Sequence, residues 1–237
     1  MDTAIERLQH VYDAVKETRK RLKGRVPLIG FAGAPWTLMC YMVDSGTTEK
    51  AKGKFAEAIG WLYSHPQESH RLLEKLADVI AEHLVNQIRA GCHLVQLFDS
   101  WAGLLSPSLY REFGTPYLKR IAEKVRSAYP DTPIICFPKG AFFAVADISR
   151  LGLFDVISLD WTIDPTWARN EVQNRVALQG NLDPLALFAS PDTIKSLVQQ
   201  MLRDFACDPN GLVGYIANLG HGCLPSYNPE HVKVFVD

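Results

Sequence analysis

A histidine between two glycines is the residue of this chain whose setting most clearly suggests chemistry. His221 stands in the segment NLGHGC, directly after a short apolar run. Glycines let a backbone approach a ligand closely, and a histidine at the end of a strand can bind a carboxylate or move a proton near neutral pH. The alternative is a loop histidine whose flanking glycines only make a turn. Its place after an apolar run favours the functional interpretation.

Three further side chains follow apolar runs and carry groups that could contact a ligand. Ser100 ends the run LVQLFDS beside Asp99, where its hydroxyl could donate to a substrate, or where either side chain could satisfy nearby backbone amides. Tyr41 lies about two helical turns after the run GFAG, a position where packing is commoner than chemistry. Lys139 is the one basic residue at the end of such a run, and a functional and a structural role fit it equally well.

The cysteines do not show the spacing of a disulfide framework or of a zinc ribbon. There are five of them, an odd number, and neither a CxxC pair nor an HExxH motif occurs. This pattern indicates reduced thiols in a cytosol-like compartment and gives little support to a metal site. We therefore predict a cytoplasmic protein without a bound metal.

Charge and hydropathy argue against two classes of partner. Lysine and arginine number 25 against 26 acidic residues, so the formal charge of −1 gives no reason to bind nucleic acid or an anionic membrane. The basic stretch 16–25 has no interleaved aromatics and is typical of a helix end that complements its own dipole. No apolar stretch approaches the roughly 18 residues of a membrane span. We predict a soluble globular protein.

Short apolar runs alternate with longer amphipathic stretches along the chain. Each run is almost continuously apolar, as is typical of a parallel strand covered on both faces. The predicted strands cover 26–33, 94–100, 133–139, 156–161, 176–181 and 214–220. The predicted helices cover about 2–23, 49–64, 67–90, 107–129, 141–151, 164–173 and 190–206, with a short last helix from Asn228. Ser-Pro or Asn-Pro pairs at 106, 190 and 228 are helix start signals.

This alternation predicts an all-parallel α/β fold, in which an open sheet and a closed barrel are the two choices. No strand is followed by a GxGxxG turn, which would be typical of an open dinucleotide-binding sheet. Polar or glycine residues follow every strand, whereas an open sheet gathers them at the one point where its strand order reverses, so the pattern favours the barrel. We predict a (β/α)8 TIM-barrel type fold in a single domain over residues 1–237. Only about six of the eight βα units are present, so we expect a barrel without its first two strands.

Five segments together resemble the uroporphyrinogen decarboxylase family: GFAGAPWTLMCYM, LFDSWAGLLSP, VISLDW, ALQGNLDP and YIANLGHG. The resemblance runs in register from about residue 2 to the end of the sequence. It implies a (β/α)8 barrel that removes carbon dioxide from the four acetate arms of uroporphyrinogen to give coproporphyrinogen. It further implies no metal or organic cofactor, and a homodimer located in the cytosol, or in the plastid if the source is a plant.

The resemblance also assigns residues. Tyr41, Ser100 and His221 correspond to polar residues that bind the substrate, and Phe31 corresponds to an apolar wall of the pocket. The family further carries an RQAGRY-like motif with two substrate-binding arginines and an aspartate that hydrogen-bonds the pyrrole nitrogens. Neither occurs in these 237 residues, so no catalytic residue is assigned here.

Two other functions remain open at this point. A related corrinoid or thiol methyltransferase would bind zinc through histidine and cysteine at strand ends. The segment that should offer such ligands reads Phe137-Pro138-Lys139, so Cys136 and Cys223 would have to suffice. A non-catalytic partial barrel that pairs with an intact partner is the other alternative.

Overall fold

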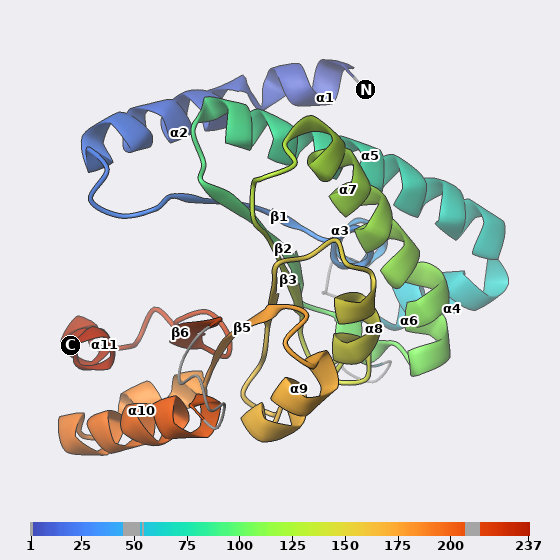
Figure 1. Cartoon of the computed structure of the whole chain (residues 1–237). Coiled ribbons are helices and arrows are strands. Elements are labelled where there is room, and N and C mark those ends of the chain that lie inside the picture. The colour runs from blue at the N-terminus through green and yellow to red at the C-terminus, as the bar shows by residue number, and fades with distance from the viewer. Residues whose placement is uncertain (1, 45–52, 54, 207–213) are drawn as a thin grey trace.

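Six parallel strands form one sheet in which every strand lies beside its neighbour in the sequence (Figure 1). The computed structural model describes residues 2–44, 53, 55–206 and 214–237. The strands are β1 Ile29–Gly33, β2 Leu94–Asp99, β3 Ile134–Pro138, β4 Val156–Ser158, β5 Ala177–Leu182 and β6 Tyr215–Leu219. All six predicted strands are present, and their order β1-β2-β3-β4-β5-β6 never reverses as it would in a doubly wound sheet. The predicted barrel-type class is confirmed.

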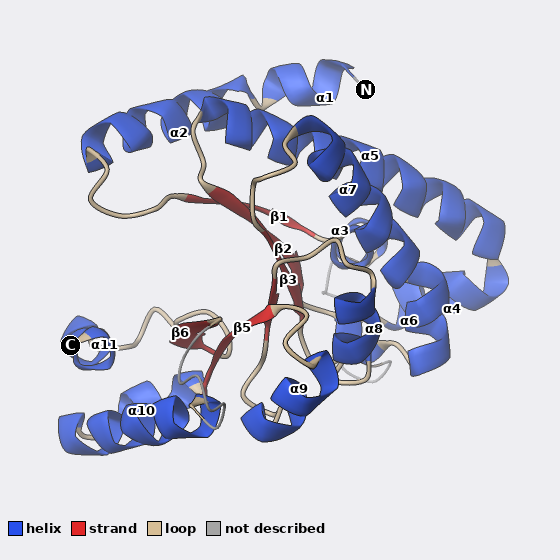
Figure 2. Ribbon diagram, viewed as in Figure 1, coloured by secondary structure: helices blue, strands red, loops and turns tan. Residues whose placement is uncertain are grey.

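Helices surround these strands on three sides of the view in Figure 2. They are α1 Asp2–Arg7, α2 Gln9–Leu22, α3 Pro35–Val43, α4 Ala56–Ser64, α5 Pro66–Ala90, α6 Pro107–Phe113, α7 Thr115–Ala128, α8 Ala144–Arg150, α9 Pro165–Val172, α10 Pro191–Phe205 and α11 Pro229–Val236. Two 3₁₀ segments, η1 Ala102–Leu104 and η2 Pro184–Phe188, follow β2 and β5. The start of the helix predicted near residue 49 lies outside the described residues, as does Cys207.

The helix starts follow the predicted signals. The side chains of Ser106, Ser190 and Asn228 each accept a hydrogen bond from a backbone N–H in the first turn of α6, α10 and α11. Each is followed by a proline at the first helical position, where a missing N–H costs nothing.

Two details of the helix prediction are wrong. The single helix expected over 107–129 is two helices, α6 and α7, that meet at Gly114. Pro116 explains the break, because it has no N–H to donate to the preceding turn and its ring crowds that turn. The structure also adds α3, which begins at Pro35 directly after β1 and was not among the expected helices.

Side chains on the strands alternate between a helix-facing side and an inner side. A Cβ built on Gly30 of β1 would lie 2.9 Å from the Gln87 side chain of α5, so this position faces the helices. Asp99 of β2 hydrogen-bonds side chains of α3 and α6, so it also faces them. The neighbouring positions, Phe31 and Phe98, therefore belong to the inner side, which corresponds to the interior of a barrel.

The sheet has two free edges within the described residues, because β1 pairs with β2 alone and β6 pairs with β5 alone. Large apolar side chains near these edges are exposed: Ile29 by 44%, Phe31 by 62% and Ile216 by 39%. In a closed barrel of eight strands both edges would be paired and the inner side chains packed in layers. The six strands thus form most of a barrel wall, in agreement with the predicted count of units.

Candidate functional site

An aromatic row crosses the inner face of the sheet from β1 to the loop after β6. The ring of Phe31 meets that of Phe98 edge-on, with centroids 6.0 Å apart, and Phe98 meets Phe137 in the same way at 6.0 Å. Phe137 in turn lies 6.1 Å from the imidazole of His221. These four residues, which we call the aromatic row, form an apolar wall that ends at a titratable group.

A second set of rings surrounds a lysine at the carboxyl ends of the strands. The Nζ atom of Lys139, after β3, lies 5.7 Å from the ring centre of Trp101 and 5.4 Å from that of Trp161. Trp161 stacks on His221 with centroids 6.4 Å apart. Tyr41 of α3 meets Trp101 edge-on at 6.3 Å. The loops after β2, β3, β4 and β6 therefore converge on one region, which we call the mouth.

The four residues that the resemblance assigned are placed as follows. Phe31 and His221 stand at opposite ends of the aromatic row. Tyr41 is 54% exposed on α3 and contacts the ring of Trp101, whose link to Trp161 and His221 runs through the ammonium group of Lys139. Ser100 is half-buried and directly follows β2. The structure thus places Phe31 and His221 in one row of rings and Tyr41 at the mouth, while their contacts with a substrate remain predictions.

Asp99, the neighbour of Ser100, has a structural role. It is 1% exposed and accepts hydrogen bonds from Thr37 Oγ1 at 2.7 Å and from the Tyr110 hydroxyl at 2.9 Å. Burial raises the pKa of Asp99 to about 6, although both hydrogen bonds act in the opposite direction. Of the two interpretations of the Asp99-Ser100 pair, the structural one thus holds for the aspartate. Its partners are side chains rather than the expected backbone amides.

The imidazole of His221 is biased toward its neutral form. Burial lowers its pKa below the ordinary value, the positive charge of Lys139 lowers it further, and Asp160 opposes both. A neutral imidazole offers one acceptor and one donor, so it can accept a proton or hydrogen-bond an acidic group.

Polar residues at the ends of β4 and β5 fix the loops of the mouth. Asp160 accepts hydrogen bonds from the backbone N–H groups of Gly140, at 2.7 Å, and Thr162, at 2.9 Å. The amide of Asn181 donates to the carbonyl oxygens of Asp160 and Ile163, at 2.9 and 2.7 Å. Asp160 and Asn181 thus hold the loops that carry Lys139 and Trp161.

The two glycines beside His221 differ in what they permit. A Cβ on Gly220 would lie 2.5 Å from the backbone nitrogen of Trp161, closer than real Cβ atoms come. A Cβ on Gly222 would meet nothing within 4 Å. Gly220 is therefore needed for the loop after β6 to approach the loop after β4, and this approach places the imidazole against the indole.

A cavity of about 230 Å³ opens on the inner side below His221. Its walls are Gln96, Phe98, Phe137, Ser158, Asn218, Leu219, His221, Gly222 and Cys223. Gln179 donates to Ser158 Oγ at 3.1 Å and to Gln96 Oε1 at 3.4 Å, so polar groups from three strands meet there. The cavity thus combines an apolar wall with hydrogen-bonding groups, as ligand sites do.

Four polar residues of the strands were not predicted from the sequence as site residues: Gln96, Ser158, Gln179 and Asn218. Each lies within a mainly apolar strand, and the signal that could have found them is a polar side chain among apolar neighbours. Gln96 is two positions before Phe98 and so faces the same side of β2. A polar side chain inside a buried strand needs a partner, which makes it a candidate for the interior of the barrel.

A curved array of parallel strands with its candidate ligand groups at the carboxyl ends is the arrangement of a (β/α)-barrel enzyme. Solved structures agree on the fold. The chain is similar to a methyltransferase from Methanosarcina mazei, with a TM-score of 0.72 at 20% identity, covering 97% of this chain and 63% of that one. It is also similar to a B12-independent methionine synthase from Shewanella sp. W3-18-1, with a TM-score of 0.62 at 13% identity, covering 94% and 63%.

Sequence comparison identifies the family. The model of the uroporphyrinogen decarboxylase (URO-D) family matches residues 1–237, so the chain belongs to this family. Relatives named uroporphyrinogen decarboxylase include those of Salinibacter ruber, 50% identical over 97% of this chain, Dictyostelium discoideum, 46% over 97%, and Homo sapiens, 46% over 100%. The chain spans 62%, 61% and 63% of the length of these relatives, respectively.

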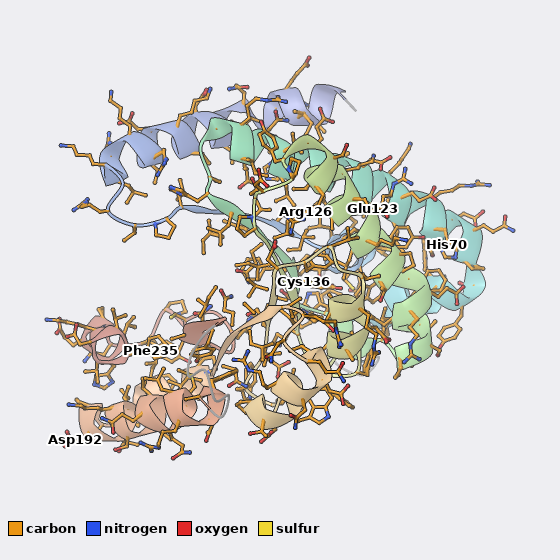
Figure 3. The ribbon with its side chains drawn as sticks, viewed as in Figure 1. His70, Glu123, Arg126, Cys136, Asp192 and Phe235 are labelled. Carbon is orange, nitrogen blue, oxygen red and sulfur yellow. The ribbon has the colours of Figure 1, made fainter. Side chains whose placement is uncertain are left out.

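These findings do not favour a zinc-dependent methyltransferase. Cys136, labelled in Figure 3, is fully buried, and it stands two positions before Pro138, the partner of the helix-facing Asp99 in the sheet, so it lies on the helix-facing side of β3. Cys223 lines the inner cavity with His221. The two cysteines therefore cannot share a metal ion. Among the described residues no group of three or more His, Cys, Asp or Glu side chains is arranged to hold one.

The helices give no sign of a membrane span. Within the described ranges, none is both long enough and apolar enough to cross a bilayer.

Proposed function

We propose that this protein takes part in the decarboxylation of the four acetate side chains of uroporphyrinogen, which yields coproporphyrinogen. Membership of the family over residues 1–237 is the observation that carries this proposal. The site supports it, because the aromatic row offers a wall for a large apolar ring system and the mouth offers cationic and hydrogen-bonding groups for its acidic arms.

The proposed reaction needs an acceptor for the electron pair that remains on carbon when carbon dioxide leaves. Loss of carbon dioxide from a simple alkyl acetate leaves an unstabilised carbanion. A pyrrole that has been protonated on a ring carbon can instead accept the departing pair itself. The protein then has to orient the ring, supply a proton and compensate the charge of many carboxylates.

The residues divide these tasks in the proposed complex. Phe31 lies against the face of the macrocycle, and Tyr41 and Ser100 donate hydrogen bonds to carboxylate arms. His221, neutral in the free protein, hydrogen-bonds a further acidic group, and binding of that group raises its pKa. We further propose that residues 1–237 belong to one barrel domain in a cytoplasmic homodimer.

The arginine motif of the family supplies the rest of the charge compensation. A substrate with eight carboxylates needs more positive charge than Lys139 and His221 at the mouth can give, and these 237 residues do not contain the motif. We therefore expect turnover to require it, because removing groups that fix a polyanion removes both its charge compensation and its orientation.

The test compares two proteins, residues 1–237 alone and the same residues preceded by a family-like segment with the RQAGRY-type motif. Both are incubated with uroporphyrinogen, and the products with seven to four carboxylates are separated by chromatography. We expect coproporphyrinogen from the extended protein and negligible turnover from residues 1–237. Full activity of the monodisperse shorter protein would show the arginines to be dispensable. Inactivity of both would refute the proposed function.

A further inference from the structure

We propose that Lys139 binds a carboxylate of the ligand, and that Trp101 and Trp161 position its ammonium group for this purpose. Lys139 is not among the residues that the family resemblance assigned. The inference rests on the proposed function for the identity of the ligand, and it adds a charged residue to that site.

The backbone of Lys139 is held on both sides. Its N–H donates to the carbonyl oxygen of Asp99 at 3.1 Å, and its own carbonyl oxygen accepts from the N–H of Gly103 at 2.9 Å. Both partners belong to β2 or to the segment that follows it. The side chain of Lys139 therefore leaves the backbone from a fixed point at the carboxyl end of β3.

The ammonium group lies between two indole rings, at 5.7 and 5.4 Å from their centres. These distances are within the range in which a cation is attracted to the face of a tryptophan. An aromatic face supplies no lone pair, whereas an ammonium group has three N–H donors. Trp101 and Trp161 thus fix the position of the charge and leave its hydrogen-bonding capacity available.

No described residue accepts a hydrogen bond from the ammonium group of Lys139. Lys139 forms neither an ion pair nor a side-chain hydrogen bond with any of them. The carboxylate of the nearby Asp160 is engaged by backbone N–H groups of two loops and by the hydroxyl of Thr162. The half-buried ammonium group of Lys139 therefore has N–H donors available for an anionic ligand. Hydrogen bonds between two charged groups are stronger than those between neutral groups, so an anion is the ligand that it would bind best.

The surroundings indicate which anion would fit. Lys139 and His221 both lie against the indole of Trp161, so both groups belong to the same part of the mouth. After burial, the positive charge of Lys139 is the second cause that lowers the pKa of His221. The aromatic row leads to this pair from β1. A ligand with an apolar ring and carboxylate arms matches the row and the lysine together, whereas a small inorganic anion matches the lysine alone.

The experiment measures binding of uroporphyrin I, a stable porphyrin with eight carboxylates, by fluorescence titration at low and high salt. The proteins are the wild type, Lys139→Met, Lys139→Arg and, as a matched control, Lys195→Met on the exposed face of α10. Circular dichroism checks that each is folded. We expect Lys139→Met to weaken binding about 10- to 100-fold, as for loss of a hydrogen bond to a charged group. Lys139→Arg should recover most of this affinity, and Lys195→Met should bind like the wild type.

Salt and a competing anion add readouts that a structural role would not change. The difference between wild type and Lys139→Met should shrink at high salt, because screening weakens a charge interaction at a partly exposed site. Inorganic phosphate should not displace uroporphyrin I at millimolar concentration. Displacement by phosphate would mean that Lys139 forms a site for small inorganic anions and not for a carboxylate of a large ligand, and this would overturn the inference.

The outcomes separate this inference from the proposed function. If binding depends on Lys139 but the extended protein does not decarboxylate uroporphyrinogen, the proposed carboxylate site stands and the proposed reaction is refuted. Turnover by the extended protein, with equal affinities in Lys139→Met and Lys195→Met, would overturn the inference and retain the reaction. A wild-type protein that does not bind uroporphyrin I would also overturn the inference.

Discussion

Replacing Asp99 by asparagine should change how the stability of the fold depends on pH. Asp99 is almost completely buried, and its pKa in the folded protein is raised to about 6 from an ordinary value of 3.8. A group with a raised folded pKa contributes stability that is fully present below the unfolded pKa and is lost as pH rises through the folded one. The loss therefore occurs between about pH 4 and pH 6.

The expected size follows from the shift of about two pKa units. Each unit corresponds to about 1.4 kcal/mol, so ionisation of buried Asp99 costs the fold about 3 kcal/mol at pH 7. Asparagine has no such ionisation. It also loses part of the acceptor capacity toward Thr37 and Tyr110, which adds an offset that does not vary with pH.

The assay is urea denaturation of the wild type and Asp99→Asn at a series of pH values from 4 to 7.5. The free energy of unfolding of Asp99→Asn, relative to that of the wild type, should rise by about 3 kcal/mol across this interval. Asp192→Asn, at an exposed position of α10, provides the control curve. Two parallel curves for wild type and Asp99→Asn would refute the reasoning, since they would mean that the buried carboxyl does not ionise in this range.

Three further predictions concern the mouth. Gly220→Ala should destabilise the fold by about 1–3 kcal/mol, because the added methyl group clashes with the backbone of Trp161. In the control Gly222→Ala the methyl group meets open space, so its free energy of unfolding in urea should stay within about 0.5 kcal/mol of the wild type. His221→Ala should weaken uroporphyrin I binding about tenfold with little change in the melting temperature, and a large drop in melting temperature at unchanged affinity would reverse this interpretation. Lys139→Met should raise the pKa of His221, followed by proton NMR of its imidazole, because the charge that disfavours the imidazolium is removed.

The strands could be predicted from the sequence because each is almost entirely apolar, and the helices of the later units because capping side chains precede them. The break at Gly114 depends on the missing N–H of Pro116, a single-residue effect within an otherwise periodic pattern. The first turn of α3 follows β1 without a capping side-chain hydrogen bond, so the usual start signal was weak there.

The site could be predicted only in part. The glycines mark His221, but the sequence does not show that Gly220 contacts the backbone of Trp161 from another loop. The position of Lys139 between Trp101 and Trp161 likewise depends on three separate loops. Such contacts are set by the register of the strands, and local pattern does not contain that information.

The sequential strand order has a consequence for how the chain is built during translation. Each strand pairs with the one before it, so every βα unit can dock on a surface that has already emerged from the ribosome. No strand has to wait for a distant partner among the described units, which keeps the entropic cost of each closure moderate. Synthesis from β1 to β6 thus extends the growing wall one unit at a time, and a pause between units would expose one strand edge to other nascent chains. Ribosome pausing after β3 should therefore leave a half-sheet that already contains Lys139 and the tryptophan of the loop after β2, while Trp161 and His221 are added only as the last three units dock.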